Sequence, residues 1–127
     1  MRTEFCLTAL RRAVAAQQPS VGLIHHSDRG AQYASGEYAE TLQRAGIVQS
    51  MSRKGNCWDN AVAESFFGKL EQALGGRARW TSVAQARLEV GRWIQEFYND
   101  ERLHSTLGFR SPVKDETVHQ ASMKETA

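Results

Sequence analysis

Two carboxylates in this chain have the setting in which paired magnesium ligands are often presented. Asp28 closes the run LIHHSD and Glu64 lies within WDNAVAESFF, with 35 residues, 29 to 63, between them. The first acid is expected at the carboxyl end of a strand, and the second in the first turns of a helix. Mg²⁺ takes few carboxylates and completes its octahedron with water and substrate oxygens, so two or three acids brought together by a fold can support phosphoryl transfer.

Each acid also has an ordinary structural interpretation. An Asp that precedes Arg-Gly is most often a turn residue, and a Glu outside an apolar stripe is most often solvated. The sequence that flanks the two acids, and not the acids alone, therefore favours a metal site.

The segments around Asp28 are predicted to form a small α/β unit. Helical spacing of apolar residues predicts a first helix that begins near Thr3. Its apolar positions are Cys6, Leu10, Ala13 and Val14. Residues 21–26 indicate a short buried strand and residues 47–52 a second one, with a helix from Gly36 to Ala45 between them, capped by Ser35. This order predicts two parallel strands joined by a right-handed crossover.

Glu64 is expected on a helix that follows a basic loop. Residues 53–58, RKGNCW, should form an exposed and mobile loop, with Asp59 and Asn60 as the helix cap. The helix should run from residue 61 to about 74, ended by Gly75-Gly76, with Glu64 outside an apolar stripe that faces the core. The stripe comprises Val62, Ala63, Phe66, Phe67, Leu70, Ala73 and Leu74.

The last third of the chain is predicted to be helical and then loose. A helix should open at Ser82, where Gln85 completes a capping box. Its inward positions are Ala86, Val90, Ile94 and Phe97. Beyond Pro112 the sequence turns polar. We therefore expect residues 1–115 to form one partial catalytic core, followed by a disordered polar tail over residues 116–127.

Several separate blocks resemble the catalytic core of the retroviral-integrase superfamily, and specifically the transposases of bacterial insertion sequences. The blocks are HSDRG (26–30) with QY (32–33), SMS (50–52) with GN (55–56), WDNA (58–61) with ESFF (64–67), and, further on, YN (98–99), Arg102, HS (104–105), LG (107–108) and SP (111–112). The resemblance implies a ribonuclease-H-like α/β fold and a triad of Asp, Asp and Glu. Asp28 would be the second acid and Glu64 the third, as ligands of a two-metal Mg²⁺ (or Mn²⁺) site.

The first acid of that triad has no counterpart here. In the family it lies on an earlier strand, and the only acid before Asp28 is Glu4. The resemblance therefore implies an amino-terminally truncated core without its first three strands, with a helix-rich carboxyl part. The complete enzyme would cleave transposon DNA and transfer its strands, with DNA ends and target, the upstream part of the transposase and further copies in a homo-oligomer as partners.

Whether this chain is itself an enzyme stays open. We expect it to be inactive alone, because the missing Asp should severely weaken metal binding and a sheet of two strands is rarely stable. One alternative is a noncatalytic fragment that binds DNA or the transposase and inhibits transposition. The other is a decayed remnant with no function.

Four residues near Glu64 are candidate DNA contacts: Arg53, Lys54, Trp58 and Asn60. Cations neutralise phosphates and an indole can stack on a base. The alternative is an ordinary solvated loop with Trp58 packed inward and Asn60 as a helix cap; a role for Asn60 beside the active centre is implied only by the resemblance. Glu71 stands where related transposases usually have Lys or Arg, and it would repel phosphate.

Two other polar groups are predicted to be structural. His25 and His26 are adjacent on a strand and point to opposite faces, so they do not readily ligate one ion. A second polar group follows the later helix: Tyr98, Asn99, Arg102, His104 and Ser105.

Composition limits the class of protein without identifying it. At 127 residues with 41% hydrophobic residues, the chain fits one globular domain. A net charge of +2 is too small to indicate a nucleic-acid binder by itself. Cys6 and Cys57 lack the spacing of a disulfide framework or zinc site, which favours free thiols in a reducing cytoplasm. No apolar run is long enough to cross a membrane.

Overall fold

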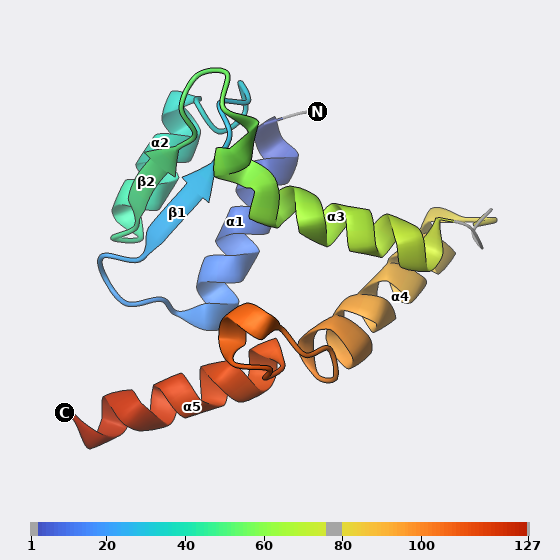
Figure 1. Ribbon diagram of the computed structural model, residues 1–127. Coiled ribbons are helices and arrows are strands. Elements are labelled where there is room, and N and C mark those ends of the chain that lie inside the picture. Colours follow the sequence, from blue (N-terminus) through green and yellow to red (C-terminus); the bar gives the residue numbers. More distant parts are fainter. Residues whose placement is uncertain (1–2, 76–79, 127) are drawn as a thin grey trace. The chain divides into compact units, whose positions relative to one another are not determined.

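The computed structural model describes residues 3–75 and 80–126, except for the side chain of Cys57. Contacts divide the chain into a first unit, Met1–Ser65, and a second unit, Phe66–Ala127. The regular elements are α1 (Thr3–Gln17), β1 (Ile24–Ser27), α2 (Gly36–Arg44), β2 (Val48–Met51), the 3₁₀ turn η1 (Cys57–Asn60), α3 (Ala61–Leu74), α4 (Val83–Arg92), the π-helical turn η2 (Trp93–Asn99), the 3₁₀ turn η3 (Ser105–Leu107) and α5 (Pro112–Glu125) (Figure 1).

The first unit is a two-stranded parallel sheet with α1 and α2 (Figure 1). The strands pair in register from Ile24 with Val48 to Ser27 with Met51. Ser35 caps α2 by accepting a hydrogen bond from the Tyr38 backbone N–H, as predicted. The predicted parallel strand, helix, strand order is confirmed.

Burial of apolar side chains between α1, α2 and the start of β2 holds the first unit together. The core residues are Cys6, Leu7, Leu10, Tyr38, Leu42 and Ile47. Cys6 carries a free thiol, as predicted. Burial raises the pKa of the Tyr38 hydroxyl to about 12, so this side chain stays neutral in the core.

The prediction of a buried strand before Asp28 is wrong. Ile24 keeps 66% of its surface exposed, and its register partner Val48 is exposed as well. Alternate residues of a strand point to opposite faces, and the side chains of His25 and Ser27 are the ones turned toward the core. Among the described residues, the sheet thus has one face turned toward the core and another, which carries Ile24 and Val48, that is exposed.

The apolar stripe predicted for residues 61–74 is largely unburied. The helix itself forms as expected, but Val62 is 89% exposed and Phe67 is exposed, whereas Phe66 and Leu70 are half-buried. Hydrophobic periodicity reports which side of a helix is apolar, and burial also requires a covering element. At the end of this helix the Gly75 amide donates to the Glu71 carbonyl, while Gly76 lies outside the described residues.

The second unit contains a series of packed aromatic rings. Phe66 contacts Tyr98 edge to face, with ring centroids 4.9 Å apart, and Trp93 at 6.0 Å. Tyr98 in turn contacts the His104 ring at 5.1 Å. Such perpendicular arrangements are favoured because the positive ring edge meets the negative face. Tyr98 and His104 thus pack within this aromatic series, as expected if the polar residues after the later helix have a structural role.

The start of α4 was predicted from the sequence, whereas the last helix was not. Ser82 caps α4 by accepting from the Gln85 backbone N–H at 3.1 Å, as expected, but the Gln85 Oε1 of the predicted capping box accepts from the Thr81 N–H instead of the Ser82 N–H. The expected loose tail beyond Pro112 is instead the helix α5. Pro112 stands in its first turn, where a missing N–H costs nothing, and Asp115 bonds to Arg110 at 2.6 Å.

Candidate metal and nucleic-acid site

Both candidate acids line one pocket of the first unit. The pocket has a volume of about 430 Å³ and lies where the ends of β1 and β2 meet the start of α3. Its lining residues are Asp28, Arg29, Ser52, Arg53, Lys54, Gly55, Asn56, Asn60 and Glu64. The structure therefore brings together Asp28 and Glu64, which 35 residues separate in the sequence.

Asp28 is held at the carboxyl end of β1 by a tight turn. Its Oδ1 accepts a hydrogen bond from the Gly30 backbone N–H at 2.8 Å. A Cβ at position 30 would lie 3.0 Å from that oxygen and 2.8 Å from Gln32 Nε2, so glycine permits this close approach. The other carboxylate oxygen has no hydrogen bond within residues 3–75 and 80–126. Asp28 thus combines a turn role with one available oxygen.

A hydrogen-bond network joins the ends of the two strands. The Ser52 amide and hydroxyl both donate to the Ser27 carbonyl, at 2.8 and 3.2 Å. The ring nitrogens of His26 lie 2.9 Å from Ser50 Oγ and 3.2 Å from Ser52 Oγ. This network fixes the residue before Asp28 to the residue before Arg53.

The two histidines point to opposite faces, as predicted. His25 faces α2, where its Nε2 lies 3.1 Å from the Tyr38 hydroxyl, while His26 faces the serines of β2 and its end. Burial lowers the pKa of His25, which favours its neutral form. Neither ring lines the pocket that holds Asp28 and Glu64.

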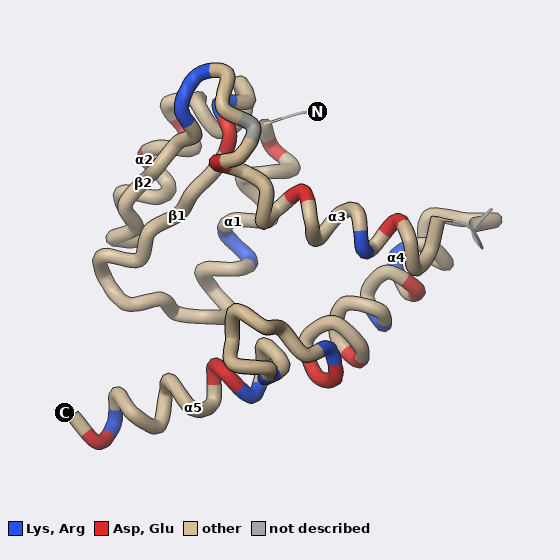
Figure 2. Tube along the Cα trace, in the orientation of Figure 1, with Lys and Arg blue, Asp and Glu red and all other residues tan. Residues whose placement is uncertain are grey.

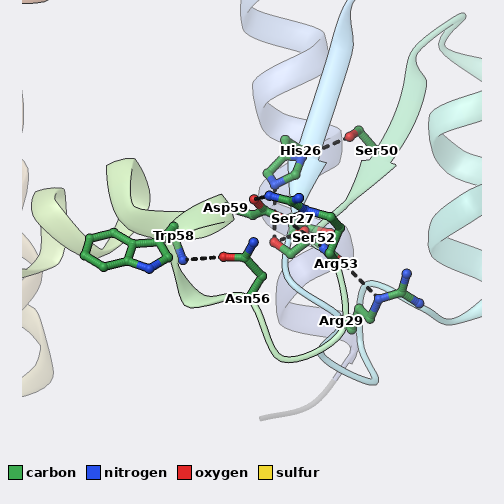
Figure 3. Close-up of polar contacts among 9 residues, drawn as sticks. All are labelled: His26, Ser27, Arg29, Ser50, Ser52, Arg53, Asn56, Trp58 and Asp59. Carbon is green, nitrogen blue, oxygen red and sulfur yellow. Dashed lines mark hydrogen bonds and ion pairs between the residues drawn. The ribbon is translucent and has the colours of Figure 1, made fainter.

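The basic loop is tied at its start. The Arg53 guanidinium donates to both carboxylate oxygens of Asp59, at 2.8 and 3.0 Å, and the Arg53 backbone N–H donates to Asp59 Oδ2 at 2.9 Å (Figure 3). These hydrogen bonds hold the pKa of the Asp59 carboxyl well below its usual range and raise the pKa of Arg53.

This pairing corrects the predicted helix cap. Asp59 and Asn60 were expected to cap the helix of Glu64, but they lie inside η1, and the Asp59 carboxylate is engaged by Arg53. The cap of η1 is Asn56, whose side-chain oxygen accepts from the Trp58 N–H at 3.0 Å. An ion pair between residues six apart is not visible in local helix signals, which explains the error.

The rest of the loop faces outward. Trp58 is 82% exposed, so the alternative in which it packs inward is wrong. Lys54 is exposed as well and lines the pocket. Figure 2 shows basic residues gathered on the loop that follows β2. A cation and an exposed indole on one loop are the groups that contact phosphates and bases.

Arg29 is a pocket residue that the sequence analysis did not single out. Its Nε donates to the Ser52 carbonyl at 2.7 Å, and the residue lines the pocket next to Asp28. Its position directly after the first acid was the only sequence signal. The arginine ties the turn of Asp28 to the strand end from which the basic loop departs.

The donor set of the pocket suits a hard divalent cation. It offers two carboxylates, Asp28 and Glu64, and the side-chain amide of Asn60, whereas the Asn56 oxygen in the same lining already accepts the Trp58 N–H. Mg²⁺ is commonly bound through one or two carboxylates, with water and phosphate oxygens in its remaining positions. Among the described residues, no three His, Cys, Asp or Glu side chains cluster as a complete metal site. The protein groups therefore fit part of a metal coordination shell.

Another hollow is found in the second unit, and its lining contains neither acid. It has a volume of about 630 Å³ and is lined by Ala84, Arg87, Leu88, Gly91, Arg92, Gln95 and Glu96. All seven residues come from α4 and η2, and neither candidate metal ligand is among them. We therefore place the candidate site in the first unit.

Within the described residues, no helix combines the length and apolar character needed to cross a membrane.

Comparison with known proteins identifies the family. Two family models described as integrase core domain match the chain, one over residues 45–112 and the other over residues 1–57. The first covers more than half of the chain and includes Glu64, and the second includes Asp28.

Curated relatives agree with this result. The chain is 43% identical over 121 residues to the insertion element IS600 uncharacterized 31 kDa protein of Shigella sonnei, covering 94% of this chain and 44% of that protein. It is 43% identical over 101 residues to the transposase for insertion sequence element IS904 of Lactococcus lactis, covering 80% and 40%. For the transposase of IS629 from Shigella sonnei the identity is 38%, covering 97% and 41%. The chain thus spans less than half the length of these relatives, and it belongs to the integrase core domain family of insertion-sequence transposases.

Proposed function

We propose that this chain is the carboxyl-terminal part of a transposase catalytic core of the ribonuclease-H-like type, with the first three strands of that core absent. The core would comprise residues 1–115. Support comes from the family and from the span of the chain, which covers 40 to 44% of the first two relatives. The described residues also form a sheet of two strands, as a core that lacks its first three strands would.

The proposed roles follow from the pocket that Asp28 and Glu64 share, which is the observation that carries the proposal. Both carboxylates would be ligands of one shared Mg²⁺ or Mn²⁺ site. Bound metal would activate a hydroxyl nucleophile and stabilise the leaving 3′ oxygen of a DNA strand. Glu4, in the first turn of α1, is the only acid before Asp28 and does not line the pocket. The chain alone would therefore bind metal weakly and be inactive.

Lys54, Trp58 and Asn60 would contact DNA beside the two acids. The support is the exposure of Lys54 and Trp58 and the place of Lys54 and Asn60 in the pocket lining. Arg53 is a further candidate: its Nε and Nη2 engage Asp59, but its side chain is 77% exposed and keeps other N–H donors for a phosphate. Transposon ends and target DNA, the upstream part of the transposase and further copies of the protein would be the partners.

A cleavage assay tests this proposal. The purified chain should give no Mg²⁺-dependent cleavage of DNA that carries the transposon ends. Adding the upstream segment of the same transposase should restore cleavage, and Asp28→Asn or Glu64→Gln should abolish the restored activity. Robust cleavage by the 127-residue chain alone would refute the assignment of an incomplete site.

A second candidate function is a noncatalytic fragment that binds DNA or the transposase and inhibits transposition. The exposed Trp58 and Lys54 favour it, because they do not depend on a complete metal site. Co-expression with an active transposase separates the two functions. Inhibition that persists in Asp28→Asn but falls in Trp58→Ala would support the binding fragment.

A further inference from the structure

The contacts between Arg53 and Asp59 close the loop between them, and we call this pair the clasp (Figure 3). Two parallel N–H···O bonds join the guanidinium to the carboxylate, the strong and directional form of this pair. The Asp59 side chain is only 19% exposed. In the other two ion pairs of the first unit, Arg11–Glu37 and Arg44–Glu40, all four side chains are more than half exposed. The Asp59 carboxylate is therefore the best shielded charged group in these three pairs, whereas the Arg53 side chain is 77% exposed.

One end of the clasp is anchored to Asp28. Arg53 directly follows Ser52, whose amide and hydroxyl both donate to the Ser27 carbonyl. Arg29 adds a third bond, from its Nε to the Ser52 carbonyl. Because Ser27 directly precedes Asp28, the backbone of Arg53 is held in a defined position relative to the first acid.

The other end of the clasp is anchored to Glu64. Asp59 lies in η1, which passes directly into α3 through a hydrogen bond from the Ala61 N–H to the Trp58 carbonyl. Glu64 is in the first turn of α3. Holding Asp59 therefore holds the start of the helix that carries the second acid.

We infer that Arg53 and Asp59 are positioning residues, which keep Glu64 in the same pocket as Asp28. The inference rests on the proposed function, since its use is to hold two ligands of one metal site together. It gives Arg53, beside its proposed phosphate contact, a role that acts through Asp59. Groups around metal ligands commonly have such orienting roles.

Asp59→Asn tests the clasp, because it removes the carboxylate charge and leaves the size of the side chain unchanged. Arg53→Lys is the second variant, since it keeps the charge but cannot form the two-bonded fork. Glu40→Gln is the matched control, because it removes an exposed pair of the same unit far from the loop in sequence. Circular dichroism verifies that each variant is folded.

The first measurement reads loop closure without any metal. Trypsin cleaves after Lys54, inside the closed loop. We expect Asp59→Asn to raise the cleavage rate at Lys54 about 10-fold, because cleavage of a native loop follows the population of its open form. Arg53→Lys should give a smaller increase and Glu40→Gln none. An unchanged rate in Asp59→Asn would show that the pair does not close the loop and would overturn the inference.

The second measurement is the affinity for Mn²⁺, determined by water-proton relaxation. Loss of the clasp should weaken Mn²⁺ binding by about 10-fold, as for other outer-shell partners of metal ligands. The double exchange Arg53→Asp with Asp59→Arg should recover part of the affinity, because it restores the side-chain pair but not the bond from the Arg53 backbone N–H.

Asp28→Asn and Glu64→Gln separate the inference from the proposed function. If both variants bind Mn²⁺ as the wild type does, the proposed metal site fails and the positioning role fails with it. If both lose Mn²⁺ while Asp59→Asn keeps full affinity despite faster cleavage at Lys54, the metal site stands and the positioning role is wrong.

Discussion

The two units of the chain are stabilised in different ways. In the first unit, Cys6, Leu10, Leu42 and other apolar side chains form a buried core, whereas Ser111 is the one buried residue among the described residues of the second. The second unit relies instead on half-exposed aromatic rings around Phe66 and Tyr98. Both candidate metal ligands belong to the first unit. The chain thus places the groups that need fixed positions in the unit that has a buried core.

Among the substitutions that test this difference between the units, Leu42→Ala should cause the largest loss of stability. Leu42 is 1% exposed, and truncation of such a side chain costs about 2–5 kcal/mol through lost burial and the remaining cavity. Hydrogen exchange should show lost protection mainly in residues 3–65. Leu88→Ala, at an exposed leucine of the second unit, is the control and should cost far less. Equal loss from both substitutions would mean that the core of the first unit is not what stabilises it.

Phe66→Ala should have a moderate effect on the second unit. Its ring packs against Phe67, Trp93 and Tyr98, and each aromatic pair contributes roughly 0.5–1.5 kcal/mol beyond burial. Urea denaturation followed by circular dichroism should show a clear loss of stability. Phe67→Ala removes a neighbouring ring that is mostly exposed and should cost less. The reverse order would contradict the role assigned to the Phe66 ring.

Histidine protonation should produce the smallest effect, confined to the first unit. Burial lowers the pKa of His25 in the folded state, so its neutral form contributes stability that is present above about pH 6.5 and lost as the pH falls below that value. The free energy of unfolding should drop between pH 7.5 and pH 5.5. In His25→Asn this drop should be smaller, and an identical drop would exclude His25 as its cause.

Local patterns predicted the elements better than they predicted burial. The parallel strands and α2 with its Ser35 cap depend on short-range spacing and capping, and these predictions are confirmed. The exposure of Ile24 and Val62 depends on which elements cover a face, and no local pattern contains that information. The helix over residues 112–125 was missed because its sequence has no apolar face.

Prediction of the candidate site had the same limits. Asp28 and Glu64 share a pocket, as the family resemblance led us to expect. The 35 residues between them contain no local signal that would have predicted this. The bonds from Arg29 to Ser52 and from Arg53 to Asp59 were not predicted. Both join side chains to partners that become neighbours only when the strand ends and the loop have folded.

The most direct test of the central claim is Mn²⁺-induced broadening of the backbone amide signals in nuclear magnetic resonance spectra of the chain. A metal held jointly by Asp28 and Glu64 should broaden the signals around both residues in the same titration, and Asp28→Asn should abolish both effects. Broadening near only one of the two acids, or unchanged broadening in Asp28→Asn, would contradict a shared metal site.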